Sequence, residues 1–183
     1  MAPKRLDQLD HIENAVWSEL AVAPHQSKHG WRVGVLATVD GNVADARSVV
    51  LRDLDKSERT LLIYADSRSP KATQIARHPL GTLVLWSATL SWQLRLRVQL
   101  GLETTGLRVS SRWARLKMTP GAQDFLSPLP PGSPVDRPSP ERGTREHFAL
   151  LTARIVAIDW LELHADGHRR AAFDESGRRW LTP

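Results

Sequence analysis

The residues best suited to bind an anion lie at positions 67–71, where the chain reads Ser-Arg-Ser-Pro-Lys. Ser69 before Pro70 is typical of a helix start, because serine caps free amides and proline is tolerated at the first helical position. The amides and the positive dipole end of a helix attract anions, and Arg68 and Lys71 add charge. Phosphate is the natural ligand of such a site, although a plain cap beside two solvated cations has the same sequence.

A second basic motif supports the anion site. Arg47 and Arg52 bracket the segment "RSVVLR", which has the composition of a β-strand. Odd and even positions of a strand face opposite sides, so the two arginines fall on opposite faces and at least one points inward or toward a partner. A buried arginine is costly without an anion to pair with, and a ligand phosphate is such an anion.

The segment 92–103 is the clearest periodic pattern in the chain. Its apolar residues alternate with Gln93, Arg95, Arg97 and Gln99, so one strand face is apolar and the other is a row of hydrogen-bond donors. Such a row is either a solvated outer face or the lining of an interface or groove. Gln93, at the start of the strand, is the position that we single out.

These residues must be positioned by a mainly β fold. We expect an amphipathic helix over 6–20 and another over 107–117, with Leu107, Trp113 and Leu116 on one side. The proline-rich segment 119–143 predicts one long loop without regular structure over most of its length. Six or seven strands without alternating helices predict one domain over 1–183, an antiparallel barrel with a few flanking helices. The strands are expected within 32–54, with a hairpin turn at 40–42, and within 59–66, 81–103 and 147–183, and a short helix over 70–78.

Composition narrows the classes of function. The 183 residues include no cysteine, which excludes disulfides, thiolate catalysis and cysteine-ligated metals. No histidine and carboxylate spacing suggests a metal site, so we predict no metal. A formal charge of +5 is consistent with an anionic partner or simply with arginines kept for solubility. Without an apolar leader or a bilayer-length apolar stretch, the expectation is a cytoplasmic protein with no membrane partner.

Three blocks, "ARSVVLR", "IYADSRSPK" and "SWQLRLRV", together resemble a known family. In this order and spacing they are similar to the FMN-binding blocks of the pyridoxamine 5'-phosphate oxidase-like split-barrel proteins, and the resemblance continues through "DWLELHADGHRRAAF". It covers most of the chain. The resemblance implies a six-stranded antiparallel split barrel that forms a homodimer, with FMN in clefts between the subunits and a small-molecule substrate.

The resemblance also implies roles for individual residues. Lys71, helped by Arg68 and Ser69, would bind the FMN phosphate, and Gln93 would reach the flavin edge from the other subunit. A cation near the flavin, Arg47 or Arg97, would stabilise its anionic reduced form. The remaining flavin contacts would be Arg47, Ser48, Val49, Val50, Leu51, Arg52, Tyr64 and Ala65, and the substrate contacts Arg115, Thr119, His168, Arg169 and Arg170.

The departures from the family pattern bear on the substrate. The vitamer oxidases carry an Arg-x-His pair over the flavin, whereas this chain has Ala171 at the histidine position. A later arginine is missing, and a serine near Ser111 replaces a tyrosine. The chain therefore resembles the broader group of FMN-binding relatives more than the vitamer oxidases themselves, and no catalytic residue is assigned.

Three classes of function follow from the sequence. The first is an FMN-dependent oxidoreductase acting on a small, in some cases phosphorylated, molecule. The second is a binding protein that holds FMN, or a related deazaflavin or tetrapyrrole, without turnover. The third is a single-strand nucleic-acid-binding barrel. The tryptophans argue against the third, because most of them fall on the apolar side of their segments and are expected in the core.

Overall fold

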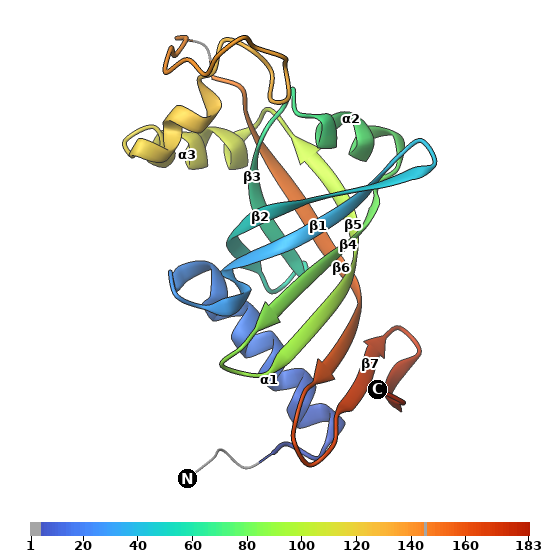
Figure 1. Ribbon diagram of the computed structural model, residues 1–183. Helices are drawn as coiled ribbons and strands as arrows, with labels where there is room; N and C mark the ends of the chain where they lie inside the picture. Colours follow the sequence, from blue (N-terminus) through green and yellow to red (C-terminus); the bar gives the residue numbers. More distant parts are fainter. Residues whose placement is uncertain (1–4, 145) are drawn as a thin grey trace.

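The fold is built on one antiparallel sheet that closes into a barrel (Figure 1). The computed structural model describes residues 5–144 and 146–183. Within these residues the strand order is β3-β2-β1-β4-β5-β6-β7-β8, and a further pairing of β3 with β6 closes a ring of six strands. The strands are β1 (Val33–Asp40), β2 (Val43–Asp55), β3 (Thr60–Asp66), β4 (Leu80–Ser87), β5 (Trp92–Glu103), β6 (Phe148–Glu162), β7 (Arg169–Asp174) and β8 (Gly177–Leu181).

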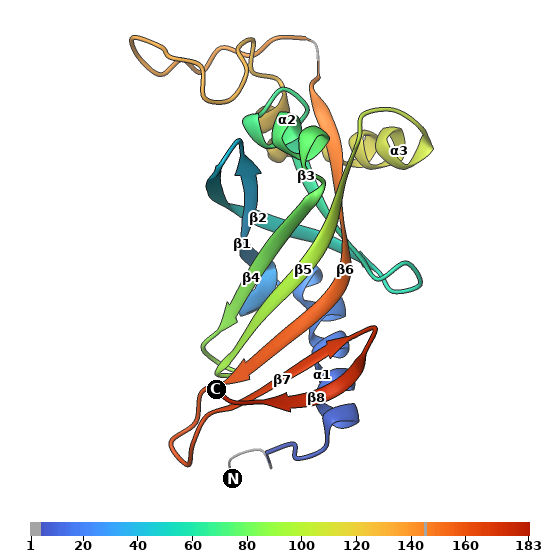
Figure 2. The same cartoon turned by 90° about the vertical axis from the view of Figure 1, so that its right-hand side faces the viewer.

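The predicted barrel is confirmed, with two strands beyond its six. β7 and β8 extend the sheet from the second half of β6 and lie outside the ring (Figure 2). The predicted hairpin between β1 and β2 is present, and Gly41 adopts a φ of 59°, a left-handed conformation that glycine tolerates well.

Six helical segments flank the sheet in the part of the chain that the structure describes. None of them combines the length and apolar character needed to cross a bilayer. They are α1 (Leu9–Val22), α2 (Pro70–Arg77), α3 (Leu107–Leu116) and the short 3-10 segments η1 (Ala23–His25), η2 (Gly30–Arg32) and η3 (Pro120–Phe125).

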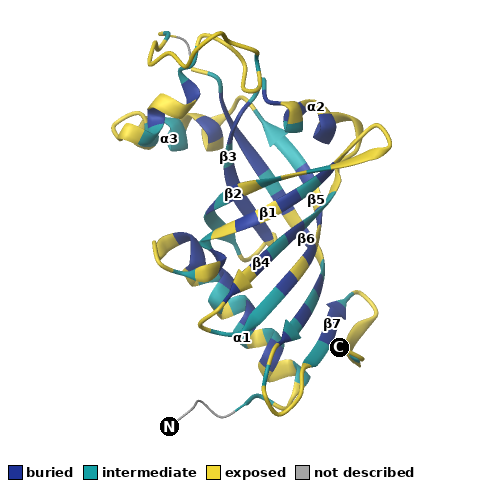
Figure 3. Cartoon of the chain, viewed as in Figure 1, coloured by how far each residue is buried: buried dark blue, intermediate teal, exposed yellow. Residues whose placement is uncertain are grey.

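The main core fills the barrel and the space between the barrel and α1. Ile12, Val16 and Leu20 project from one face of α1 and are fully buried against apolar residues of the strands. Figure 3 shows that most of β3 and β6 is buried, whereas the tip of the β1–β2 hairpin is exposed. The alternation of β5 fits this core, since Leu94, Leu96 and Val98 point inward.

A second apolar cluster lies on the outer face of β3 and β6, beneath α3 and η3. It comprises the buried residues Leu62, Val109, Phe125, Phe148 and Leu150, with Tyr64, Trp113 and Leu116 packed against them. The prediction that Leu107 faces this side was wrong, because Leu107 is 83% exposed and Val109 supplies the contact. Because Phe125 anchors η3 here, the loop predicted over 119–143 begins with a short helical turn.

Most tryptophans are indeed core residues. Trp31 and Trp160 are fully buried, and Trp17, Trp92 and Trp113 pack against the two clusters. Trp86 and Trp180 are nearly half exposed. The described tryptophans therefore do not form the row of exposed rings that single-strand nucleic-acid binding requires.

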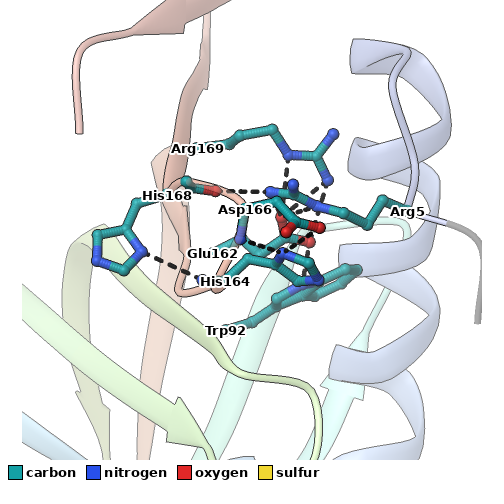
Figure 4. Close-up of polar contacts among 8 residues, drawn as sticks. Arg5, Trp92, Glu162, His164, Asp166, His168 and Arg169 are labelled. Carbon is teal, nitrogen blue, oxygen red and sulfur yellow. Dashed lines mark hydrogen bonds and ion pairs between the residues drawn. The ribbon is translucent and has the colours of Figure 1, made fainter. Parts of the chain in front are cut away.

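A buried carboxylate ties the N-terminal segment to the end of the sheet (Figure 4). Glu162, at the end of β6, accepts hydrogen bonds from Arg5 and from Arg169 of β7, and Trp92 Nε1 lies 3.4 Å from its Oε1. Burial opposes ionisation of Glu162, but the bonds from the two arginines outweigh it and hold its pKa below the ordinary value. The ionised form is therefore favoured by folding.

We expect the variant Glu162→Gln to lose about 2–4 kcal/mol of unfolding free energy at pH 7, because two arginines lose their anion. A lowered folded pKa means that this contribution is present above the unfolded pKa and disappears as pH falls through the folded value. Urea denaturation at pH 7 and at a pH below 4.5 measures the loss of unfolding free energy and its dependence on pH. Asp166→Asn, at an 82% exposed side chain, is the control and should change stability by less than about 1 kcal/mol. An equal deficit of the glutamine variant at both pH values would contradict this account.

Candidate functional site

Two basic residues from distant parts of the chain meet beside the first turn of α2. Lys71 occupies that turn, after Pro70 at the first helical position. Arg47 lies on β2 opposite Leu36, on the inward face near one end of the barrel. Arg47 donates to Gln74, which follows Lys71 by three residues on α2, and this contact places both cations in one site.

The guanidinium of Arg47 is held rigidly by neighbours on three elements. It donates to Thr38 Oγ1 at 2.6 Å and to Gln74 Oε1 at 2.9 Å, both of which belong to buried residues. It also forms an ion pair with Asp45 at 2.5 Å. Gln74 in turn donates to Asp45, so β1, β2 and α2 are joined through one polar network.

Lys71 has no carboxylate partner among the described residues. Its half-buried ammonium donates to Ser69 Oγ at 3.1 Å. Burial lowers the pKa of Lys71, and the nearby charge of Arg47 lowers it further, while Asp66 and Asp45 only partly compensate. Because the nearby carboxylates do not fully offset burial and the charge of Arg47, an added anion would stabilise the Lys71 ammonium. The amides at the start of α2 favour an anion at the same place.

Ser69 is the N-cap residue of α2, as predicted, but the prediction that its hydroxyl caps the free amides was wrong. Ser69 has the extended backbone of a cap residue, but its hydroxyl donates to the carbonyl of Asp66 at 2.7 Å instead of accepting from an amide of α2. Its oxygen is thus oriented to receive the Lys71 ammonium. The hydroxyl positions Lys71, and the amides of the first helical turn carry no side-chain cap.

Arg68 connects this site to the proline-rich loop. Its guanidinium forms two hydrogen bonds with the buried carboxylate of Asp66, at 3.1 and 2.7 Å. It also donates to the carbonyl oxygens of Ser127 and Pro128, at 3.0 and 3.4 Å. The Arg68 side chain therefore divides its four hydrogen bonds equally between Asp66 and the loop, and so ties the loop to the turn before α2.

The outer face of β2 presents a different set of groups. Ser48, Val50 and Arg52 lie on this face, opposite to Arg47, as predicted from their spacing. The guanidinium carbon of Arg52 is 5.2 Å from the centre of the Tyr64 ring, a cation–π contact. The Nε of Arg52 is buried and has no hydrogen-bond partner among the described residues.

Three other predicted contacts have buried side chains. Val49 and Leu51 point into the barrel core, and Ala65 of β3 is 3% exposed. These residues can meet a ligand only through their main chain. The structure therefore divides the predicted cofactor residues into a cationic end, at Arg47 and Lys71, and a strand surface that leads to Arg52 and Tyr64.

Gln93 lies far from Lys71 within one chain. It is the second residue of β5, whereas the amide of Leu100, farther along the same strand, donates to the carbonyl oxygen of Pro79, just after α2. Seven strand residues span about 23 Å. The expectation that Gln93 acts on the ligand of another subunit stays a prediction.

The predicted substrate residues fall at the two ends of the molecule. Arg115 and Thr119 are exposed at and after α3. His168, Arg169 and Arg170 lie at the start of β7, where Arg169 pairs with Glu162 and Arg170 pairs with Asp159. The structure does not bring the two groups together within one chain (Figure 1).

Sequence reasoning missed the polar residues that hold Arg47. Thr38, Asp45 and Gln74 were not identified, although Gln74 follows Lys71 by one helical turn and so shares its face. The sequence did offer one signal for this network, because Gln74 is a polar residue on the apolar side of a short helix.

Comparison with known proteins bears on this arrangement. Residues 14–102, which contain Arg47, Lys71 and Gln93, match the family model described as pyridoxamine 5'-phosphate oxidase, FMN-binding domain. Over these residues the chain is similar to the pyridoxamine 5'-phosphate oxidase-like family, in agreement with the curated relative described below. The predicted resemblance is thereby confirmed, and the matched region corresponds to the family's FMN-binding domain.

Individual relatives agree with this assignment. A pyridoxine/pyridoxamine 5'-phosphate oxidase of Caulobacter vibrioides is 25% identical over 80% of this chain and 72% of its own length. A pyridoxamine 5'-phosphate oxidase-related, FMN-binding protein from Nostoc punctiforme has a TM-score of 0.72 at 23% identity, over 93% of this chain and 96% of its own. PhzG from Burkholderia lata has a TM-score of 0.75 at 15% identity, over 98% of each chain. These two structures share the fold.

The contact between Arg68 and the loop predicts a change in protease sensitivity. Arg68→Ala removes the hydrogen bonds to Ser127 and Pro128, so tryptic cleavage after the exposed Arg142 should become at least threefold faster. Limited proteolysis followed by mass spectrometry measures this rate. Arg108→Ala, which removes a solvent-exposed pair with Glu103, should leave it unchanged. Equal rates in the Arg68 variant and the unmodified protein would refute the tethering role of Arg68.

Proposed function

We propose that this protein is a homodimeric FMN-dependent oxidoreductase that acts on a small molecule. The observation that carries the proposal is the half-buried Lys71 ammonium, which has no carboxylate partner among the described residues and lies beside Arg47 at the start of α2. In a chain whose matched region is an FMN-binding domain, a terminal phosphate is the anion that this site fits best.

The residues present fit the whole cofactor as well as its phosphate. Lys71, oriented by Ser69, and Arg47 would bind the phosphate. From Arg47 to Arg52 the strand extends about 16 Å, which gives an elongated ligand a continuous surface of main chain and outward side chains. Arg52 and Tyr64 stand at the far end of this surface, where the buried Nε of Arg52 has a free hydrogen. That donor would meet a carbonyl or ring nitrogen of the flavin.

Bound FMN would supply a ring that accepts or donates a hydride equivalent, and the chain's own residues would bind and orient it. Arg52 offers positive charge beside the ring, and Gln93 of a second subunit would add a hydrogen bond at its edge. Arg115 and Thr119 of one subunit and residues 168–170 of the other would approach the same cleft only if two chains combine.

An apolar band on the outer face of β1 and β4 supports the dimer. Val35 of β1 lies directly opposite Val84 of β4, and Val33, Val39 and Leu80 continue the same face with exposed fractions of 50%, 39% and 64%. Trp86, 43% exposed, pairs with Gln93 at the edge of this band. A second copy that covers the band would bring its own Gln93 to the joint cleft.

The phosphate assignment predicts the behaviour of Lys71→Ala. Loss of a charge-assisted contact to phosphate should weaken FMN binding by at least tenfold, measured by quenching of flavin fluorescence on titration. The matched control is Lys56→Ala at an exposed turn, which should bind FMN as the unmodified protein does. If the unmodified protein quenches no flavin fluorescence, FMN binding is wrong; if Lys56→Ala is as damaging as Lys71→Ala, the phosphate site is wrong.

The dimer predicts the behaviour of Val35→Asp. A carboxylate placed in the apolar band should convert the dimer to a monomer and abolish high-affinity FMN binding, because each cleft would lose its second subunit. Light scattering after size-exclusion chromatography measures the mass, and circular dichroism checks the fold. Val135→Asp, on the 57% exposed side chain of a loop residue, should remain dimeric. A monomeric unmodified protein that binds FMN tightly would overturn this arrangement.

A non-catalytic flavin-binding protein is the second candidate. It is favoured because Arg169 and Arg170, two of the predicted substrate contacts, already form ion pairs with carboxylates of the same chain. Turnover assays of the FMN-loaded protein separate the two candidates. Oxidation of pyridoxamine 5'-phosphate or of another small reductant supports the enzyme.

A further inference from the structure

A charged groove of about 450 Å³ lies on the outer face of the sheet. Its lining comes mainly from β5 to β8, and Figure 2 shows these four strands side by side. Its position differs from that of the Lys71 site, since it follows the middle of β5 and the added strands β7 and β8. The lining residues are Thr82, Arg95, Arg97, Ala157, Ile158, Asp159, Ala172, Asp174, Arg179 and Leu181.

The charges of this groove do not cancel. Arg95 donates to Asp159 at 2.9 Å, and Arg179 forms two hydrogen bonds with Asp174, at 2.9 and 2.6 Å. Arg97 is exposed and makes no hydrogen bond or ion pair with any described residue. Three lining arginines therefore face two lining aspartates, which leaves one positive charge centred on Arg97.

Arg97 and Asp174 line the same groove. The pKa of Asp174 lies below its ordinary value, first because Arg179 donates to it. Arg97 has no such partner among the described residues. Its five donors in a planar fork match the two oxygens of a carboxylate or phosphate.

The rest of the groove suits the apolar body of a small molecule. Ala157, Ala172 and Leu181 give it apolar walls, and Thr82 adds one hydroxyl. The volume is within the range of small-molecule sites. Gln93 lies on the same face of β5, two residues before Arg95 or about 7 Å along the strand, so a molecule here would lie next to the ring that Gln93 is proposed to contact.

We propose that this groove binds the carboxylate or phosphate monoester of a small substrate, with Arg97 as its main anion ligand. The location beside the flavin rests on the proposed function, whereas anion binding in the groove does not. Arg97, one of the expected flavin contacts, is thereby assigned to the substrate. The proposal also limits the substrate class to molecules that carry an anionic group on an apolar body.

Isothermal titration calorimetry of the protein as purified tests the groove with three probes. Benzoate and phenyl phosphate present the two anionic groups, and benzyl alcohol is the neutral probe of similar shape. We expect both anions, or whichever one matches the substrate, to bind at least tenfold more tightly than benzyl alcohol. Arg97→Ala should reduce this binding by at least tenfold.

Two variants separate a specific site from general attraction of anions. Arg154→Ala removes an exposed arginine of β6 that lies outside the groove, and it should bind the probes as the unmodified protein does. Asp174→Asn removes a negative charge and releases Arg179, so it should tighten anion binding at least twofold. Equal losses in the Arg97 and Arg154 variants, or probe binding that Asp174→Asn does not tighten, would overturn the proposal.

The outcome for FMN is read separately by flavin fluorescence. If the anions bind through Arg97 but the protein binds no FMN, the groove is an anion site and the proposed flavin function fails. If FMN binds through Lys71 and neither anion depends on Arg97, the groove assignment fails and the flavin function stands.

Discussion

The pairing of β3 with β6 is the interaction on which the rest of the structure depends. It joins strands that are distant in the sequence through seven aligned positions, from Thr60 opposite Arg154 to Asp66 opposite Phe148. This pairing closes the barrel, so the apolar faces of six strands share one core. It also forms the outer surface on which Tyr64, Phe148 and the residues of α3 pack. The last bond of this seam, from Ser67 N to His147 O, leads the chain directly into the start of α2.

About half of the described arginines form ion pairs with carboxylates of the chain. Asp66 holds Arg68, Asp159 holds Arg95 and Arg170, and Glu162 holds Arg5 and Arg169. Among them, the pair of Arg5 with Glu162 joins residues that are far apart in the sequence. Lys71 beside α2 and Arg97 in the outer groove are among the described cations that have no carboxylate partner. A cation without an internal partner has more to gain from an external anion than one already paired.

The two sites follow from the two faces of each strand. On β2 the inward Arg47 reaches α2, and the outward Arg52 reaches Tyr64, so one strand presents both ends of an elongated surface. On β5 the inward leucines build the core, and the outward Gln93 and Arg97 border the apolar band and the groove. The same alternation that makes the barrel stable therefore places polar groups on its outside at regular spacing.

The sequence by itself determined the barrel, the opposite faces of Arg47 and Arg52, and the basic start of α2, because these depend on local periodicity and on residue type. It also indicated the family, through short blocks whose order and spacing are local properties. Only the tertiary structure decided how those residues are used. Ser69 turned its hydroxyl to Asp66 and not to the helix amides, Arg68 was taken up by Asp66 and the proline-rich loop, and Leu107 was replaced in the core by Val109. Each of these outcomes depends on a partner far away in the sequence or on the exact path of a turn, and neither is encoded in the spacing of one segment. The separation of Gln93 from Lys71 is of the same kind, since it arises from the length and direction of β5 within the closed sheet.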